Sequence, residues 1–134
     1  MYAWLQFRFT DVLNRYPDNH AAMFGLGRVQ QATGNSKRAE ESYRAVLHQV
    51  PEHTMALYSL GYILSENGHC HDAVKYLSRV LQLRPGSVET LIILGKCFIE
   101  MGRKTKAREV LESAKHRQPG NPDVHKLLSK LHSL

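Results

Sequence analysis

The sequence lacks several features that mark large classes of protein. Glycine and proline are sparse, with 9 and 5 among 134 residues, which excludes a collagen-like or low-complexity chain. Two cysteines, Cys70 and Cys97, are too few for a disulfide framework. Charged or amide side chains interrupt every apolar stretch before it reaches the roughly 18 residues that a membrane-spanning helix needs. We therefore expect a soluble protein without a membrane span.

The start of the chain lacks a targeting segment. Its first residues have neither the basic beginning nor the uninterrupted apolar core of a secretory signal. We therefore expect a cytoplasmic location, an expectation that lapses if the chain is part of a longer protein. With 43% hydrophobic residues, the chain is also too apolar to be disordered throughout.

Catalytic and metal-binding motifs are missing as well. No glycine-rich phosphate loop and no motif around a serine or cysteine nucleophile occurs. His69, Cys70 and His71 are adjacent in the sequence, so they do not readily converge on one ion. His125 and His132 would lie about 10 Å apart along a helix, too far to share an ion without further ligands. We therefore expect no enzyme active site, no metal site and no cofactor.

Positive charge is in excess and is unevenly distributed. Lysine and arginine number 18 against 12 aspartates and glutamates, for a net charge of +6. Residues 101–134 hold eight of the bases and three of the acids, whereas residues 1–100 are nearly balanced. The ordinary interpretation is a solvated basic surface, and an acidic partner or nucleic acid are the alternatives.

A regular period runs through the sequence. Prolines stand at equal intervals, at positions 17, 51, 85 and 119. Glycine recurs at the same spacing at 27, 61 and 95 and again at 34, 68 and 102, and alanine recurs at 39, 73 and 107. Leucine precedes the first glycine of each period, at 26, 60 and 94. Four residue types in one frame indicate a structural repeat.

One period, residues 54–87, illustrates the local structure that the repeat predicts. Its first apolar stretch places large residues at helical spacing, and Gly68 supplies the left-handed residue that ends a helix. The stretch 71–83 again has apolar residues three and four apart, and Pro85 prevents its continuation. Ser87 is suited to cap the helix that follows. Each period therefore predicts two helices joined by a short turn.

The order Leu-Gly, Gly, Ala and Pro within one period resembles the tetratricopeptide repeat, whose unit is about 34 residues long, and the resemblance covers nearly all of the chain. Gln30 and Leu64 depart from it, at a place that is often aromatic in the family. The resemblance implies an all-α fold, a right-handed α-solenoid of antiparallel helix pairs with about eight helices. We place complete repeats at 20–53, 54–87 and 88–121, the second helix of a truncated repeat at 1–19, and a C-terminal capping helix at 122–134.

The resemblance also implies a function, because the first helices of tetratricopeptide repeats line a concave groove that binds segments of other proteins. The exposed side of each first helix is the one opposite Leu26, Leu60 and Leu94. On that side we expect a peptide-binding groove of aromatic, aliphatic and charged residues, namely Phe24, Arg28, Tyr58, Tyr62, Glu66, Ile92, Lys96 and Glu100. The chain is therefore expected to be a non-catalytic protein–protein interaction scaffold for a peptide or amphipathic helix of a partner, within a larger complex or a longer protein.

Two other functions stay open. An RNA-binding helical repeat would use the basic segment 103–117, but the expected groove is nearly neutral and lacks a repeating code for bases, so nucleic acid is not favoured. The chain could also be a substrate-recognition segment of a longer enzyme. A role beside heat-shock chaperones is disfavoured, because the basic clamp that the family uses for their acidic C-termini is absent. The places of that clamp hold Phe24, Arg28, Ser59, Glu89 and Ile93.

Large apolar residues concentrate at the N-terminal edge. Trp4, Leu5, Phe7 and Phe9 belong to the expected second helix of the truncated repeat, without a first helix of that repeat to cover them. An exposed apolar edge favours association. The rest of a longer array, a second copy in a homodimer, or a partner chain could cover it.

Overall fold

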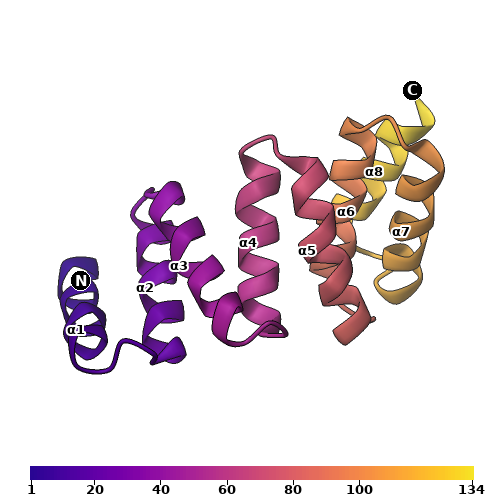
Figure 1. The fold of residues 1–134 in the computed structure, drawn as a ribbon. Helices are drawn as coiled ribbons and strands as arrows, with labels where there is room; N and C mark the ends of the chain where they lie inside the picture. The colour runs from indigo at the N-terminus through magenta and orange to yellow at the C-terminus, as the bar shows by residue number, and fades with distance from the viewer. The chain divides into compact units, whose positions relative to one another are not determined.

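Helices joined by short turns make up the computed structural model, which describes residues 1–134 (Figure 1). The eight helices are α1 (Tyr2–Arg15), α2 (His20–Ala32), α3 (Ser36–Gln49), α4 (Thr54–Glu66), α5 (Cys70–Leu83), α6 (Val88–Glu100), α7 (Lys104–Arg117) and α8 (Pro122–His132). The expected all-α class with about eight helices is therefore confirmed. None of these helices is long and apolar enough to cross a bilayer.

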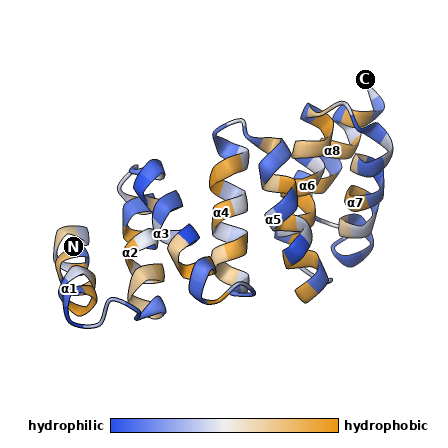
Figure 2. Ribbon diagram, viewed as in Figure 1, coloured by the Kyte–Doolittle hydropathy of each residue, from blue (hydrophilic) through white to orange (hydrophobic).

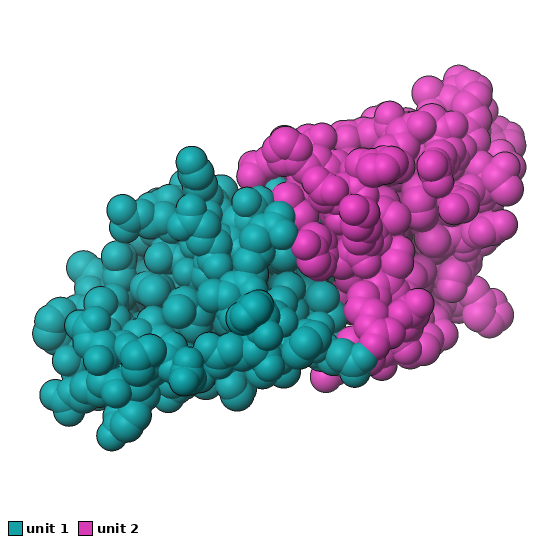
Figure 3. All heavy atoms as spheres, in the orientation of Figure 1, with its two compact units in different colours: residues 1–63 teal, residues 64–134 magenta.

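The helices form two compact units, residues 1–63 and residues 64–134, and the boundary falls within α4 (Figure 3). In the first unit, α1 packs against α2 and α2 packs against α3. In the second unit, α5 packs against α6, α6 against α7, and α7 against α8, while α6 also contacts α8. Within each unit a helix thus packs mainly on its neighbours in the sequence, as in a helical repeat.

Caps and glycines determine where the helices begin and end. Helices α2, α4, α6 and α8 begin at positions 20, 54, 88 and 122, at the interval of the sequence period. The side chain of Ser87 accepts a bond from the backbone N–H of Thr90 at 3.4 Å, as predicted for a cap. After α2, α4 and α6, Gly34, Gly68 and Gly102 have φ values of +83°, +81° and +73°. Glycine adopts this left-handed conformation without steric cost, so the predicted helix ending at Gly68 is confirmed.

Two glycines inside helices let paired helices approach closely. Gly27 of α2 faces the ring of Tyr43 of α3, and Gly95 of α6 faces Leu111 of α7. Both large side chains are fully buried. A Cβ atom at Gly95 would lie 2.5 Å from Cδ2 of Leu111. Only glycine, which has no side chain, allows α6 and α7 to lie this close together.

Burial also explains which helices are hydrophobic. Helix α6 is hydrophobic along most of its length, whereas α7 is mostly hydrophilic (Figure 2). Helix α6 contacts α5, α7 and α8, so it buries several sides, including Leu91, Leu94 and Cys97. Helix α7 buries only the narrow stripe that includes Leu111.

A polar residue that departs from the repeat pattern finds a partner in the core. Gln30 is buried on α2, and its Oε1 atom accepts a hydrogen bond of 2.6 Å from the hydroxyl of Ser42 on α3. A buried polar group with such a partner avoids the cost of an unsatisfied one. The structure therefore accommodates glutamine where the family often has an aromatic residue.

The core also contains titratable groups that burial keeps neutral. Burial raises the pKa of the Cys70 thiol above its usual value near 9, and its neighbours Cys97 and Glu100 raise it further. Burial likewise raises the pKa of Cys97 and that of Tyr43. Cys97 is fully buried, so it packs as a small hydrophobic residue, as the sequence predicts.

We expect Gly95→Ala to lower the free energy of unfolding by about 1–2 kcal/mol, because overlap with buried Leu111 outweighs the better helix propensity of alanine. Gly120→Ala is the control, since a Cβ atom there meets no other atom within 4 Å. Its stability should change by no more than about 0.5 kcal/mol. Urea denaturation measures both variants. If Gly95→Ala is as stable as the wild type, α6 and α7 tolerate a wider separation.

The raised thiol pKa values predict a loss of stability at alkaline pH. Above pH 9 the unfolded chain releases its thiol protons while the folded chain keeps them, so the free energy of unfolding falls. The double variant Cys70→Ala, Cys97→Ala lacks these groups. Between pH 8 and pH 10.5 we expect it to lose less stability than the wild type, by roughly 2 kcal/mol for each thiol that stays protonated in the folded chain. Urea denaturation across that range measures both curves, and parallel curves would mean that the thiols titrate normally in the folded chain.

Candidate functional site

The predicted groove residues of α2 differ in their surroundings. Phe24 is half-buried, and the centroid of its ring lies 5.6 Å from that of Tyr43 and 5.0 Å from that of His53. Arg28, one turn further along α2, is exposed. Phe24 therefore contributes to packing within residues 1–63 and is only partly accessible to a ligand.

Helix α4 carries an exposed apolar face. Tyr58 and Tyr62 stack with their ring centroids 6.5 Å apart and their planes 23° apart. Tyr62 is 37% exposed, and Met55 is 55% exposed. Positions 55, 58 and 62 are three and four residues apart, so their side chains fall on one side of the helix. We refer to Met55, Tyr58 and Tyr62 as the α4 face.

The four predicted edge residues of α1 divide between two sides of the helix. Leu5 and Phe9 face α2, where they line a recess of about 270 Å³ together with Arg28. Trp4 and Phe7 are instead 63% and 68% exposed. The sequence pattern treated the four as one edge, whereas only two of them are open in residues 1–63.

In residues 64–134, the predicted groove residues also separate into exposed and packed ones. Glu66 is exposed in the last turn of α4, and Lys96 and Glu100 are exposed on α6. Ile92 packs against the hydrophobic core that includes Val88. Ile92 is therefore mainly a structural residue.

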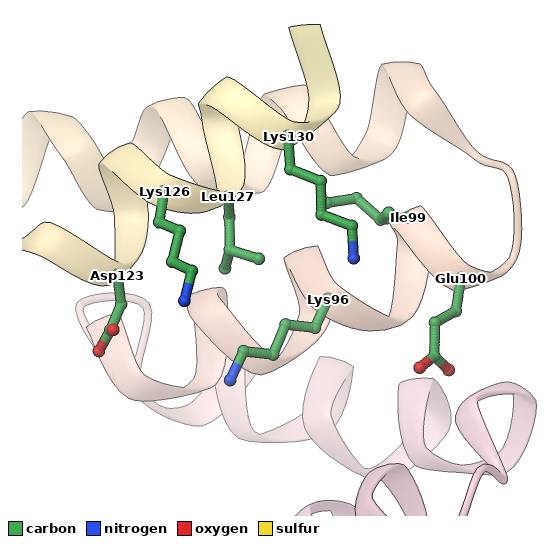
Figure 4. A pocket seen from close by; sticks show the side chains of 7 residues that line it. All are labelled: Lys96, Ile99, Glu100, Asp123, Lys126, Leu127 and Lys130. Carbon is green, nitrogen blue, oxygen red and sulfur yellow. The ribbon is translucent and has the colours of Figure 1, made fainter. Parts of the chain in front are cut away.

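A recess of about 320 Å³ lies between α6 and α8 (Figure 4). Three lysine side chains extend into the same space, Lys96 from α6 and both Lys126 and Lys130 from α8, with Leu127 between the two from α8. We refer to Lys96, Lys126 and Lys130 as the lysine cluster. The other residues that line the recess are Ile99, Glu100 and Asp123.

Sequence reasoning missed the contribution of α8, because it treated residues 122–134 only as a cap. The period itself contained the signal. Lys126 and Lys130 stand one period after Ile92 and Lys96, at the corresponding positions of the next first helix. The exposed side of α8 therefore continues the kind of surface that was predicted for α6.

Glu100 is engaged by a thiol from α5 rather than by a lysine. The Sγ atom of Cys70 donates a hydrogen bond of 3.0 Å to Oε2 of Glu100. Lys96 and Glu100 are four residues apart, a spacing that permits an ion pair on a helix, yet they form none, and the lysine cluster has no ion pair at all. Figure 4 shows the Glu100 carboxylate pointing away from the lysine ammonium groups.

The structure contains no cluster of metal-binding side chains. No three His, Cys, Asp or Glu residues lie close enough together to hold an ion. Cys70 and Cys97 are free and buried, and their raised pKa values keep them protonated at neutral pH. A protonated thiol is a poor nucleophile.

Comparison with protein-family models identifies tetratricopeptide repeats along the chain. One tetratricopeptide repeat model matches residues 64–131, and a second matches residues 8–54 and 27–66. No curated protein sequence matches the chain.

Several solved structures share the fold. MamA from Desulfovibrio magneticus matches with a TM-score of 0.92 at 20% identity, over 96% of this chain and 72% of that one. YrrB, described as a TPR protein with an unusual peptide-binding site, matches with a TM-score of 0.89 at 20% identity, over 96% of this chain and 66% of YrrB. A tetratricopeptide repeat protein from Parabacteroides merdae gives 0.86 at 19% identity, over 96% and 52%.

This chain is shorter than these relatives, since it spans from 52% to 72% of their lengths. At 19–20% identity, the structural matches establish the fold. The tetratricopeptide repeat model that matches residues 64–131 covers half of the sequence. The chain therefore belongs to the tetratricopeptide repeat family.

Proposed function

We propose that the chain is a non-catalytic protein-interaction module that binds a peptide or a helical segment of a partner through the exposed sides of its first helices. The tetratricopeptide repeat family generally mediates protein–protein interactions, and the peptide-binding site ascribed to YrrB supports this assignment. In this proposal, the repeats at 20–53, 54–87 and 88–121 each supply one first helix. We place the chain, and therefore this interaction, in the cytoplasm.

The α4 face is the observation that carries the proposal. Met55 and Tyr62 expose large apolar side chains, and covering such surface with a partner is favourable. A tyrosine ring provides apolar contact while its hydroxyl hydrogen-bonds at the rim, which is why tyrosine is frequent among binding anchors. The spacing of Met55, Tyr58 and Tyr62 suits an apolar stripe on a partner helix.

The remaining groove residues have supporting roles in this proposal. Arg28 and Glu66 are exposed charges that would orient a bound segment. Phe24 stabilises α2, which presents Arg28, and Ile92 stabilises α6, which presents Lys96 and Glu100, through the packing described above.

Truncation of the α4 face tests the proposal. Peptides are first selected on the wild-type chain from a random phage-displayed library, and the strongest is synthesised with a fluorescent label. We expect the double variant Met55→Ala, Tyr62→Ala to bind that peptide about tenfold more weakly, because two apolar anchors are lost. Fluorescence anisotropy measures both dissociation constants.

Tyr16→Ala is the control, because Tyr16 is 65% exposed at the end of α1 and lies outside the α4 face. Circular dichroism should show that both variants remain folded. If the folded double variant keeps the wild-type affinity, the α4 face is not the binding site. If no peptide is selected above background, the proposal of peptide binding is wrong.

Self-association through α1 stays a prediction. Trp4 and Phe7 are exposed, and a second copy of the chain could cover them. If they drive dimer formation, Trp4→Asp, Phe7→Asp should sediment as a monomer at a concentration where the parent is a dimer. Identical masses would exclude this patch as the dimer contact.

A further inference from the structure

The lysine cluster places three positive charges around one recess. Lys96, Lys126 and Lys130 line about 320 Å³ between α6 and α8. None of the three forms an ion pair. Lys126 and Lys130 are four residues apart on α8, where like charges on a helix repel each other. An anion placed among the three ammonium groups would offset this repulsion.

The two acidic residues of the recess offset the charge of the three lysines only in part. Glu100 accepts its hydrogen bond from Cys70, and its carboxylate points away from the lysines (Figure 4). Asp123 lies in the first turn of α8, where the helix dipole favours a carboxylate. The space between the lysine side chains therefore retains a positive potential.

The recess also has an apolar part, which distinguishes among anions. Leu127 lies between the lysine side chains of α8 (Figure 4), and Ile99 is only partly buried. A segment that combines carboxylates with apolar side chains makes use of both kinds of surface. A nucleic-acid backbone supplies phosphates but no aliphatic side chain that could pack against Leu127 and Ile99.

We propose that the recess between α6 and α8 binds an acidic segment of the partner protein, with its Asp or Glu carboxylates held by Lys96, Lys126 and Lys130. Ammonium groups form charge-assisted hydrogen bonds with carboxylates, and an apolar side chain of the segment packs against Leu127. The inference rests on the proposed peptide-binding function and specifies the chemistry of the partner.

The test uses the phage-selected peptide and a neutral version in which Asn and Gln replace every Asp and Glu. We expect the acidic peptide to bind about tenfold more tightly at low salt. The difference should shrink as NaCl is raised from about 50 to about 500 mM, because salt screens exposed charges. Lys96→Gln, Lys126→Gln, Lys130→Gln should bind both peptides with equal affinity.

The matched control is Lys37→Gln, Lys106→Gln, Lys115→Gln, which removes the same number of charges from exposed positions outside the recess. This control should still prefer the acidic peptide. The acidic-segment proposal is overturned if the wild type binds both peptides equally well. It is also overturned if the control variant loses the preference for the acidic peptide together with the recess variant. Peptide binding itself stands in both cases. The acidic-segment proposal is likewise overturned if the selected peptides are not enriched in Asp and Glu.

Two further outcomes separate the alternatives. If a labelled oligouridine binds more tightly than the acidic peptide at physiological salt, and the recess variant but not the control loses that binding, the recess is a nucleic-acid site and the proposal is wrong. If the library yields no peptide at all, both the acidic-segment proposal and the proposed function fail.

Discussion

The close approach of paired helices is the constraint on which the other features depend. Gly27 lies against Tyr43, and Gly95 lies against Leu111, and both large side chains are fully buried. A helix pair has too little apolar surface to form a core alone, so α6 also packs against α5 and α8. Once these sides of α2 and α6 are committed to packing, only the remaining side of each helix is available to a ligand. The sides of α2 and α6 that carry the two glycines are therefore not available to a ligand.

A single hydrogen bond connects the interior of residues 64–134 with their exposed recess. The Cys70 thiol donates a hydrogen bond to Glu100, and burial raises its pKa so that it keeps the proton well above neutral pH. Glu100 is thereby drawn away from Lys96, its neighbour four residues earlier on α6. Cys70 is buried and does not line the recess, but its bond to Glu100 affects where the negative charge lies at the recess. The net charge of the sequence, +6, does not reveal this local arrangement.

Most of the fold could be predicted from the sequence, because the signals that define it act over a few residues. Gly68 ends α4 because its φ of +81° suits glycine, and Ser87 caps α6 through its own side chain. These local signals recur with the sequence period. The period therefore predicted the number of helices, and the residues that recur in it identified the resemblance to the family. Helical spacing likewise placed Lys96 and Glu100 on the exposed side of α6.

The sequence by itself therefore determined the helices, their order and their outward faces. Only the tertiary structure decided how each face is used, because that depends on contacts between helices. Phe24 packs against Tyr43, and Ile92 joins the core, so both are less available than their helical positions implied. Lys126 and Lys130 join Lys96 around one recess because α8 packs beside α6. The period places these residues at corresponding positions of α6 and α8, but it does not show that their side chains line the same space.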